Sequence, residues 1–212
     1  MSRSWRRRLI GMVAMAAALV PVGAGAAGPS FSRPAGLPAQ PQLYGAACPT
    51  ATTCVVVGGA DVATVLTSTD AGRTWASTTV AGIGALYGVA CFDAHNCVAV
   101  GTAGGVGSDA IAVTHDGQTW TAVASLPAAP ALSSVSCVAP SRCMAVGAVS
   151  GGTSGWTAAA LFSFDGGATW ATAATPTHQG TPTALNAVRC PATQRCLVAG
   201  GGAWVTDNFG GS

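Results

Sequence analysis

Short runs of Val, Ala, Leu and Thr, interrupted every few residues by Gly or Pro, make up most of the chain after residue 43. β-branched residues favour strands, and Gly and Pro mark the turns between strands. The pattern therefore predicts an all-β protein built from many short strands. Between residues 86 and 124, the runs predict four such strands, at 86–91, 97–101, 110–114 and 120–124.

Eight cysteines divide the chain into four repeats. They form pairs that all have the spacing C-x5-C: Cys48 and Cys54, Cys91 and Cys97, Cys137 and Cys143, and Cys190 and Cys196. The first cysteines of successive pairs lie 43, 46 and 53 residues apart, and similar apolar runs flank every pair. Four short strands in each repeat of that length predict a stacked or radial β fold with one four-stranded antiparallel sheet per repeat.

The cysteine pairs predict one disulfide within each repeat. Each pair flanks a five-residue loop between two predicted strands, where cross-strand Cβ atoms come within bonding reach. A zinc site is the weaker alternative, because zinc ligands cluster at shorter spacing or include His, and His95 is the one His in these loops. We expect no metal and no cofactor.

A second motif follows the cysteines in each repeat. The pattern S-x-D-x-G-x-T-W is complete at 68–75 and 163–170, one residue short at 114–120, and incomplete at 206–212. It resembles the Asp box of the BNR repeat family, which occurs in sialidases and in propeller-type photosystem assembly factors. The resemblance covers nearly all of residues 27–212 and implies a β-propeller of about four blades. The residues that carry the motif are Asp70, Gly72, Trp75, Asp116, Trp120, Asp165, Gly167, Trp170 and Asn208.

The residue types of this motif are those of a turn. An Asp carboxylate can accept backbone N–H bonds within its own turn, and Gly allows the backbone to close it. The Trp that follows then buries its ring against the next blade. We therefore expect Asp70, Asp116 and Asp165 to hold turns rather than to catalyse a reaction.

The two ends of the repeat region are complementary. Phe31 lies 17 residues before Cys48, as Trp120 lies 17 residues before Cys137, so the segment after residue 26 begins with the last strand of a blade. The fourth repeat stops just short of that strand. We expect the N-terminal strand to close the ring, which removes exposed sheet edges. A shortened chain or a run of hairpins without closure is the alternative.

Residues 1–26 have the pattern of an export signal. Arg6, Arg7 and Arg8 precede an apolar stretch at 9–22 and an A-x-A site at 24–26. The Sec pathway is favoured over the twin-arginine pathway, because Trp5 stands where Ser or Thr is usual. We expect residues 27–212 to be a secreted, monomeric single domain, not associated with the membrane after cleavage.

Charge restricts the function. Residues 27–212 contain five Arg against seven Asp, a formal net charge of −2, and the whole chain has no Lys and no Glu. Nucleic-acid binding is therefore not expected, since it needs a basic surface. A sialidase uses several Arg and a Tyr activated by Glu, so the chain also lacks that catalytic set and no catalytic residue is predicted.

The candidate binding surface comprises the loops opposite the Asp motifs, where the resemblance places binding residues. Its candidate ligand-binding residues are Asp61, Asp109, Trp156 in a predicted insertion at 150–159, and His178; Tyr44 and Tyr87 are candidates to line the centre. The prediction is a secreted, non-catalytic scaffold or binding protein for an unknown carbohydrate or protein ligand. The alternative is a carbohydrate-active enzyme, a sialidase-like glycoside hydrolase with a non-standard site.

Overall fold

The computed structural model describes residues 32–34, 37, 42–104, 109–114, 116–124, 126–127, 131–150, 155–178, 181–182, 184–192 and 194–207. By internal contacts the chain divides into two units, Met1–Arg33 and Pro34–Ser212, and all of the described strands belong to the second unit. Among the described residues, no helix is long and apolar enough to cross a membrane.

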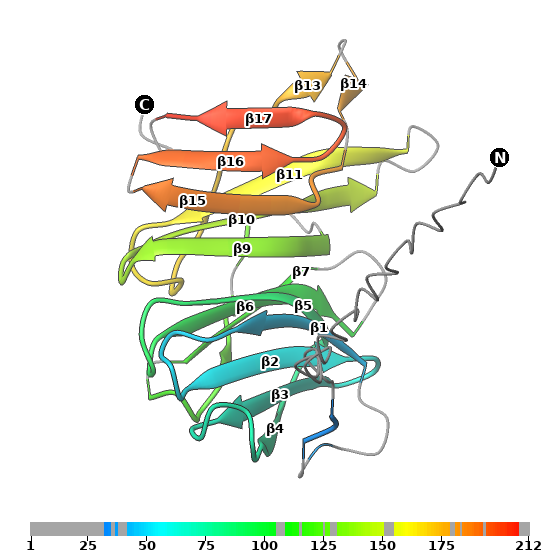
Figure 1. The fold of residues 1–212 in the computed structure, drawn as a ribbon. Coiled ribbons are helices and arrows are strands. Elements are labelled where there is room, and N and C mark those ends of the chain that lie inside the picture. Colours follow the sequence, from blue (N-terminus) through cyan, green and yellow to red (C-terminus); the bar gives the residue numbers. More distant parts are fainter. Residues whose placement is uncertain are drawn as a thin grey trace, which may run out of the picture. The chain divides into compact units, whose positions relative to one another are not determined.

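Four antiparallel sheets follow one another along the second unit, each with its strands in chain order (Figure 1). Sheet 1 contains β1 (Leu43–Ala47), β2 (Cys54–Gly59), β3 (Ala63–Ser68) and β4 (Ala76–Val80). Sheet 2 contains β5 (Ile83–Cys91), β6 (Cys97–Ala103), β7 (Asp109–Thr114) and β8 (Thr121–Ala122). Sheet 3 contains β9 (Ala131–Ala139), β10 (Arg142–Ser150), β11 (Trp156–Ser163) and β12 (Ala171–Thr172). Sheet 4 has three described strands, β15 (Ala187–Ala192), β16 (Arg195–Ala199) and β17 (Ala203–Thr206).

The predicted strands of the second repeat all exist, although their bounds differ. The fourth is shorter than expected, because β8 holds only two residues and Trp120 lies outside it. Beyond β8, the Val123 N–H donates to the Ile111 carbonyl over 2.8 Å, so the pairing continues for one more bond. A small hairpin of β13 (Thr177–His178) and β14 (Thr181–Pro182) precedes sheet 4 and was not expected from the sequence.

The structure has the four disulfides that the cysteine spacing predicts, one in each sheet. Each joins the first strand of its sheet to the second across the loop between them. Cys91 lies directly opposite Cys97 in the ladder, and Cys137 lies opposite Cys143. The chain thus has no free cysteine among the described residues.

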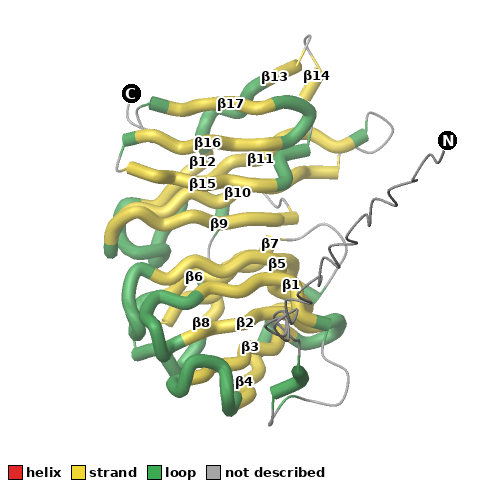
Figure 2. Tube along the Cα trace, viewed as in Figure 1, coloured by secondary structure: helices red, strands yellow, loops and turns green. Residues whose placement is uncertain are grey.

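The sheets pack side by side through their first strands, β1 against β5, β5 against β9 and β9 against β15. Figure 2 shows the same strands in yellow, joined by green loops. One apolar cluster fills each gap between neighbouring sheets. Hydrogen bonds from the Val188 and Cys190 backbone N–H groups to Ser134 Oγ and Ser136 Oγ, at 3.2 and 3.0 Å, add polar contacts between sheets 3 and 4.

The Trp residues of the turn motif pack in the opposite direction to the one expected. Trp120 of sheet 2 belongs to the cluster between sheets 1 and 2, and Trp170 of sheet 3 belongs to the cluster between sheets 2 and 3. Each ring is buried and covers the preceding sheet rather than the next one. The turn motif determines that the ring is buried, but the stacking of the sheets determines which neighbour it contacts.

A β-bulge recurs at one position in the first strand of sheets 1 to 3. The register skips Tyr44 between Leu43 and Gly45, Tyr87 between Leu86 and Gly88, and one residue between Leu132 and Ser134. The partner strand carries Gly58, Gly101 or Gly147 opposite the bulge, where a Cβ atom would collide with a carbonyl oxygen of the first strand. The Gly that ends each cysteine-proximal apolar run is therefore required by close backbone approach.

Candidate ligand pocket

The Asp motifs form compact turns between the third and fourth strands of sheets 1 to 3, called here the Asp turns (68–75, 114–120 and 163–170). In the first, the Asp70 carboxylate accepts the Thr74 backbone N–H at 2.9 Å, the Thr74 hydroxyl at 2.6 Å and the Ser68 hydroxyl at 2.8 Å. Asp165 repeats this arrangement with Thr169 and Ser163. Every described hydrogen bond that these two carboxylates accept comes from a residue of the same turn.

These hydrogen bonds stabilise the charged form of each carboxylate. Those from Thr74, and then that from Ser68, lower the pKa of Asp70 from 3.8 to about 2. Backbone N–H groups of Gln118 and Thr119 hold the pKa of Asp116 far below its ordinary value. Burial raises the pKa of Asp165, but its hydrogen bonds together lower it below the ordinary value. A carboxylate held in its charged form at neutral pH by such partners is a poor proton donor, so this arrangement does not favour the Asp turns as acid catalysts.

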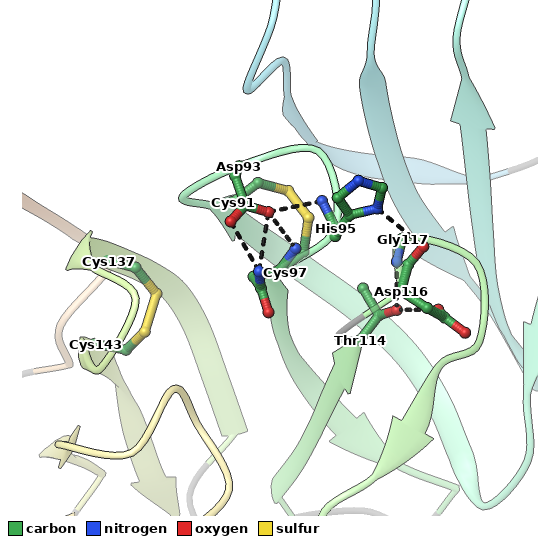
Figure 3. The surroundings of a disulfide bond; sticks show 10 residues. Cys91, Asp93, His95, Cys97, Thr114, Asp116, Gly117, Cys137 and Cys143 are labelled. Carbon is green, nitrogen blue, oxygen red and sulfur yellow. Dashed lines mark hydrogen bonds between the residues drawn. A yellow bond between two sulfur atoms is a disulfide. The ribbon is translucent and has the colours of Figure 1, made fainter.

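The cysteine loops and the Asp turns lie at the same end of the sheets and bind each other. The N–H of the residue after each Asp donates to the fourth loop residue after the first Cys: Ala71 to Thr52 at 2.8 Å, Gly117 to His95 at 2.9 Å, and Gly166 to Ser141 at 3.2 Å. In sheet 2, His95 Nδ1 also lies 3.3 Å from the Asp116 carbonyl oxygen, and Asp93 accepts the His95 N–H (Figure 3). The disulfides of sheets 1 to 3 therefore hold the loops that support the neighbouring turns.

The opposite end of the sheets contains the cavity that we call the Trp156 pocket. It has a volume of about 580 Å³ and is lined by residues of sheets 1, 2 and 3. Asp61 comes from the loop between β2 and β3, Tyr87 and Thr102 come from β5 and β6, and Trp156 begins β11. Two of the four residues predicted to bind a ligand, Asp61 and Trp156, thus share one cavity although they are far apart in the sequence.

Tyr87 reaches the pocket because of the bulge in β5. A bulged residue leaves the ladder and its side chain is re-aimed relative to a regular strand. Tyr44, the equivalent residue of β1, packs edge-on against Tyr87 with ring centroids 5.1 Å apart. The Tyr44 hydroxyl donates to Gln42 Oε1 at 2.6 Å. The repeated bulge therefore places two tyrosines of neighbouring sheets in contact beside the cavity.

Trp156 does not lie in a loop insertion, contrary to the expectation from the sequence. It is the first residue of β11 and pairs with Ser150, and residues 157–159 continue that strand. Trp156 is still 54% exposed. Strand position, rather than loop flexibility, presents this indole ring to solvent.

The remaining predicted site residues are less well placed or lie outside the described part. The backbone of Asp109 begins β7 opposite Thr102, and His178 belongs to β13, but the directions of their side chains lie outside the described residues. Asn208 and Phe31 both lie outside the described residues. Sequence reasoning missed Thr102; its position directly after the bulge-facing Gly101 is the signal that could have indicated it.

The pocket has one formal charge among its described lining residues, that of Asp61, and no Arg or His. Three of the described Arg side chains have partners elsewhere: Arg73 donates to the Asp70 carbonyl, Arg142 lies over the Phe164 ring at 5.4 Å, and Arg195 pairs with Asp207 at 2.6 Å. Small residues form the part of the lining that we call the floor of the pocket: Gly84, Ala85, Ala103 and Gly104. An anionic ligand therefore has no counter-charge in this cavity.

Successive antiparallel sheets of up to four strands, packed first strand to first strand with turns at one end and a pocket at the other, define a β-propeller type of fold. No family model and no curated protein sequence matches the chain. Among solved structures, it is similar to YCF48 bound to D1 peptide, with a TM-score of 0.52 and 15% identity over 79% of this chain and 54% of that one. It is also similar to the GH74 enzyme of Niastella koreensis, with a TM-score of 0.54 and 18% identity over 76% of this chain and 27% of that one.

A GH74 xyloglucanase from Xanthomonas campestris gives a TM-score of 0.52 at 20% identity, over 74% of this chain and 26% of that one. These similarities show a β-propeller fold. The chain spans about half the length of the YCF48 chain and about a quarter of each GH74 enzyme.

Proposed function

We propose that this protein is a non-catalytic binding protein that holds its ligand in the Trp156 pocket. The observation that carries the proposal is the convergence of Asp61, Tyr87 and Trp156, from three different sheets, on a single cavity. Small-molecule sites are concave and mostly apolar, with a few polar groups that orient the ligand. The pocket has this composition, and its volume of about 580 Å³ is in the usual range for such sites.

A catalytic role has less support. Glycoside hydrolysis of the common kind needs two carboxyl groups flanking the scissile bond. The described lining of the pocket provides one carboxylate, Asp61, and the chain contains no Glu. The carboxylates of the Asp turns lie at the other end of the sheets and accept hydrogen bonds from their own turns.

The similar structures are compatible with a binding role. One of them is described as YCF48 bound to a peptide, and others are GH74 enzymes, one a xyloglucanase. The same blade architecture thus serves in those proteins for peptide binding and for action on a glycan. We propose a protein or carbohydrate as ligand for this chain on that basis, together with the pocket.

The experiment compares two single variants in a ligand screen. Purified residues 27–212 are tested against a glycan array and a peptide array, and any ligand found is titrated with Trp156→Ala and with Phe164→Ala. Phe164 is a matched control, since it is an aromatic residue 47% exposed within the Asp turn of sheet 3, at the other end of the sheets. We expect Trp156→Ala to abolish binding and Phe164→Ala to retain it. Equal binding by both variants would contradict the proposal.

A carbohydrate-active enzyme is the second candidate, because Asp109 begins β7 directly opposite Thr102, a lining residue of the pocket. Asp61 and Asp109 would then be its two carboxylates. Release of reducing ends from a neutral polysaccharide such as xyloglucan, abolished by either Asp61→Asn or Asp109→Asn, would establish this candidate. Absence of turnover by the wild-type protein that still binds the polysaccharide would exclude it.

Export and family membership belong to the same proposal. The four disulfides indicate that the protein matures in an oxidising compartment. We propose that residues 1–26 are a signal peptide and that the Asp turns are Asp boxes of the BNR type. Support comes from the basic and apolar pattern of that segment, and from the shared hydrogen bonds of Asp70 and Asp165.

We also propose that the N-terminal strand around Phe31 closes a ring of four blades. In sheet 3, the residues after Trp170 pair with β11, whereas β17 pairs with β16 alone among the described strands. An apolar cavity of about 290 Å³ beside β17 is lined by Met144, Val198 and Trp204, among others. The cavity lies between sheets 3 and 4. The corresponding space between sheets 2 and 3 holds the indole ring of Trp170.

The outer face of sheet 4 gives the proposal further support. Leu197 is 50% exposed, whereas its equivalents Val98 and Met144, each directly after the second Cys of its pair, are 0% and 6% exposed under the following sheet. Sheet 4 thus has the apolar face of a blade that receives a neighbour. In a closed ring, sheet 1 is that neighbour.

A further inference from the structure

We propose that the Trp156 pocket is specific for an uncharged sugar ring, which stacks on the Trp156 indole and hydrogen-bonds to Asp61. This inference rests on the proposed function and names the class of ligand. It is carried by three features of the pocket: an exposed indole, a floor without long side chains, and a polar edge that both accepts and donates.

The indole provides the stacking surface. Trp156 is 54% exposed although its backbone is fixed in a ladder with Ser150, so the ring is presented to ligands on a rigid element. An aromatic face is apolar and electron-rich, and it attracts the C–H face of a pyranose more strongly than it attracts a hydrated anion. Rigid presentation also lowers the entropy lost on binding.

The floor allows a flat ring to approach the backbone. It consists of Gly84, Ala85, Ala103 and Gly104, at the start of β5 and just beyond β6. The backbones already lie close together here, since a Cβ on Gly84 would be 3.1 Å from the Gly104 Cα. A broad cavity with such a floor accommodates a ring lying parallel to the indole, whereas a long branched side chain would leave most of this surface uncovered.

The polar edge matches hydroxyl groups. A sugar hydroxyl both donates and accepts, and it is best bound by a carboxylate together with a hydroxyl. Asp61 supplies the acceptor, and Thr102 and Tyr87 supply hydroxyls that donate or accept. The contact of Tyr87 with Tyr44 restricts the orientation of its ring, which fixes the direction of its hydroxyl.

Charge excludes other ligands of similar size. Sialic acid, uronic acids and phosphorylated sugars need a cation at their anionic group. No Arg or His is among the described lining residues, the sequence contains no Lys, and Asp61 repels anions. A quaternary ammonium ion is the alternative that Asp61 would attract, but such ions are bound in cages of several aromatic faces. Two aromatic residues line this pocket in the described part of the chain.

The test is a glycan array carrying neutral and acidic glycans, probed with the purified 27–212 protein, followed by calorimetric titration of the best neutral glycan. We expect neutral glycans to bind and their sialylated or uronate-bearing counterparts to bind at least tenfold more weakly. Trp156→Ala should reduce the affinity at least tenfold, Trp156→Phe should restore most of it, and Phe164→Ala should leave it unchanged. Asp61→Asn should weaken binding by a smaller factor, since the amide still accepts a hydrogen bond.

Different failures have different meanings. Preference for acidic glycans, or binding of choline but of no sugar, would overturn the sugar proposal. If the Trp156→Ala variant no longer bound that other ligand, the pocket would still be the binding site. The same holds for a peptide that binds in place of any glycan. A bound neutral glycan whose affinity is insensitive to Trp156→Ala would overturn the pocket itself.

Discussion

Single residues of the Asp turns show which backbone conformation the motif requires. The residue after the Asp has a positive φ in each described turn: 61° at Ala71, 74° at Gly117 and 77° at Gly166. Gly adopts this conformation without strain, but an L-residue such as Ala does not. Ala71 is therefore a strained residue that the hydrogen bonds of its turn maintain.

Ala71→Gly should stabilise the protein by up to about 1 kcal/mol, because it removes the strain of a left-handed Ala. Gly117→Ala should destabilise it by more than that, since its Cβ would also lie 2.5 Å from the Ala94 carbonyl oxygen. Urea unfolding of both variants measures the two effects. If Ala71→Gly left the stability unchanged or lowered it, the entropy that Gly adds to the unfolded chain would outweigh the strain relieved in the folded state.

The two buried tryptophans of sheets 2 and 3 differ in one hydrogen bond. Trp170 Nε1 donates to the Gly167 carbonyl at 2.8 Å, whereas Trp120 Nε1 is buried without a partner among the described residues. The second Asp turn is one residue shorter than the third, so its carbonyl groups are placed differently relative to the ring. The shortened motif thus keeps the buried ring but loses the bond that normally orients it.

Trp170→Phe should cost about 1 kcal/mol more in unfolding free energy than Trp120→Phe, because only the former breaks a hydrogen bond. Both substitutions remove a similar apolar area from a buried site, so the difference isolates the bond. Thermal or urea unfolding of the two variants provides the measurement. Equal losses would show that a water or another group satisfies Trp120 in solution.

At the scale of the element, each Asp turn is a pH-sensitive unit. The pKa of Asp70 falls from 3.8 to about 2 on folding, so the folded state holds the charged carboxylate more strongly than the unfolded chain does. Its stabilising contribution is complete above the unfolded pKa and is lost as the pH falls through the folded one. Asp116 and Asp165 shift in the same direction, so the three turns weaken together in acid.

Stability should therefore be constant near neutral pH and decrease between pH 3.8 and about 2. Urea midpoints over this range, compared between wild type and Asp70→Asn, test the assignment. The variant should be less stable at neutral pH but should lose less on acidification, because its turn no longer titrates. A parallel decrease of both proteins would show that the acid sensitivity arises elsewhere.

At the scale of the whole molecule, sheets 1 to 4 share the same strand order and disulfide, and sheet 4 differs in the exposure of its outer face. Sheets 1 to 3 each bury an apolar face under the next sheet, whereas Leu197 and Val205 of sheet 4 are 50% and 55% exposed. Sheet 4 is also the sheet whose third strand, β17, has no described partner on its outer side. Closure by the N-terminal strand would supply that partner.

The closure proposal predicts that deletion of residues 28–33 lowers the melting temperature and promotes aggregation, because in a closed ring it would remove the partner of the β17 edge. Phe31→Trp should be tolerated, since Trp occupies the equivalent position in the other three repeats. Differential scanning calorimetry and size-exclusion chromatography distinguish the outcomes. A monomeric deletion variant with an unchanged melting temperature would contradict closure.

The sequence alone determined the features whose parts lie close together along the chain. The disulfide between Cys91 and Cys97 spans six residues, and the bonds of Asp70 reach no further than Thr74. Such spacing restricts the backbone to a few conformations, so the repeat, the four disulfides and the turn role of the Asp residues follow from the pattern itself. The same repeat predicts a stacked or radial β fold, because sheets of this size must pack against one another. The resemblance of the Asp motif to the Asp box is what implied a β-propeller.

Only the tertiary structure decided the features that depend on how the sheets stack. The bulge that re-aims Tyr87 arises where Gly101 lets two backbones approach, and a periodic pattern of apolar residues does not register it. Pairing with Ser150 within sheet 3 extends β11 to Trp156, and the stacking of the sheets brings that residue into the same pocket as Asp61, almost a hundred residues earlier. The pocket is formed by inter-sheet distances, which no local spacing in the sequence encodes.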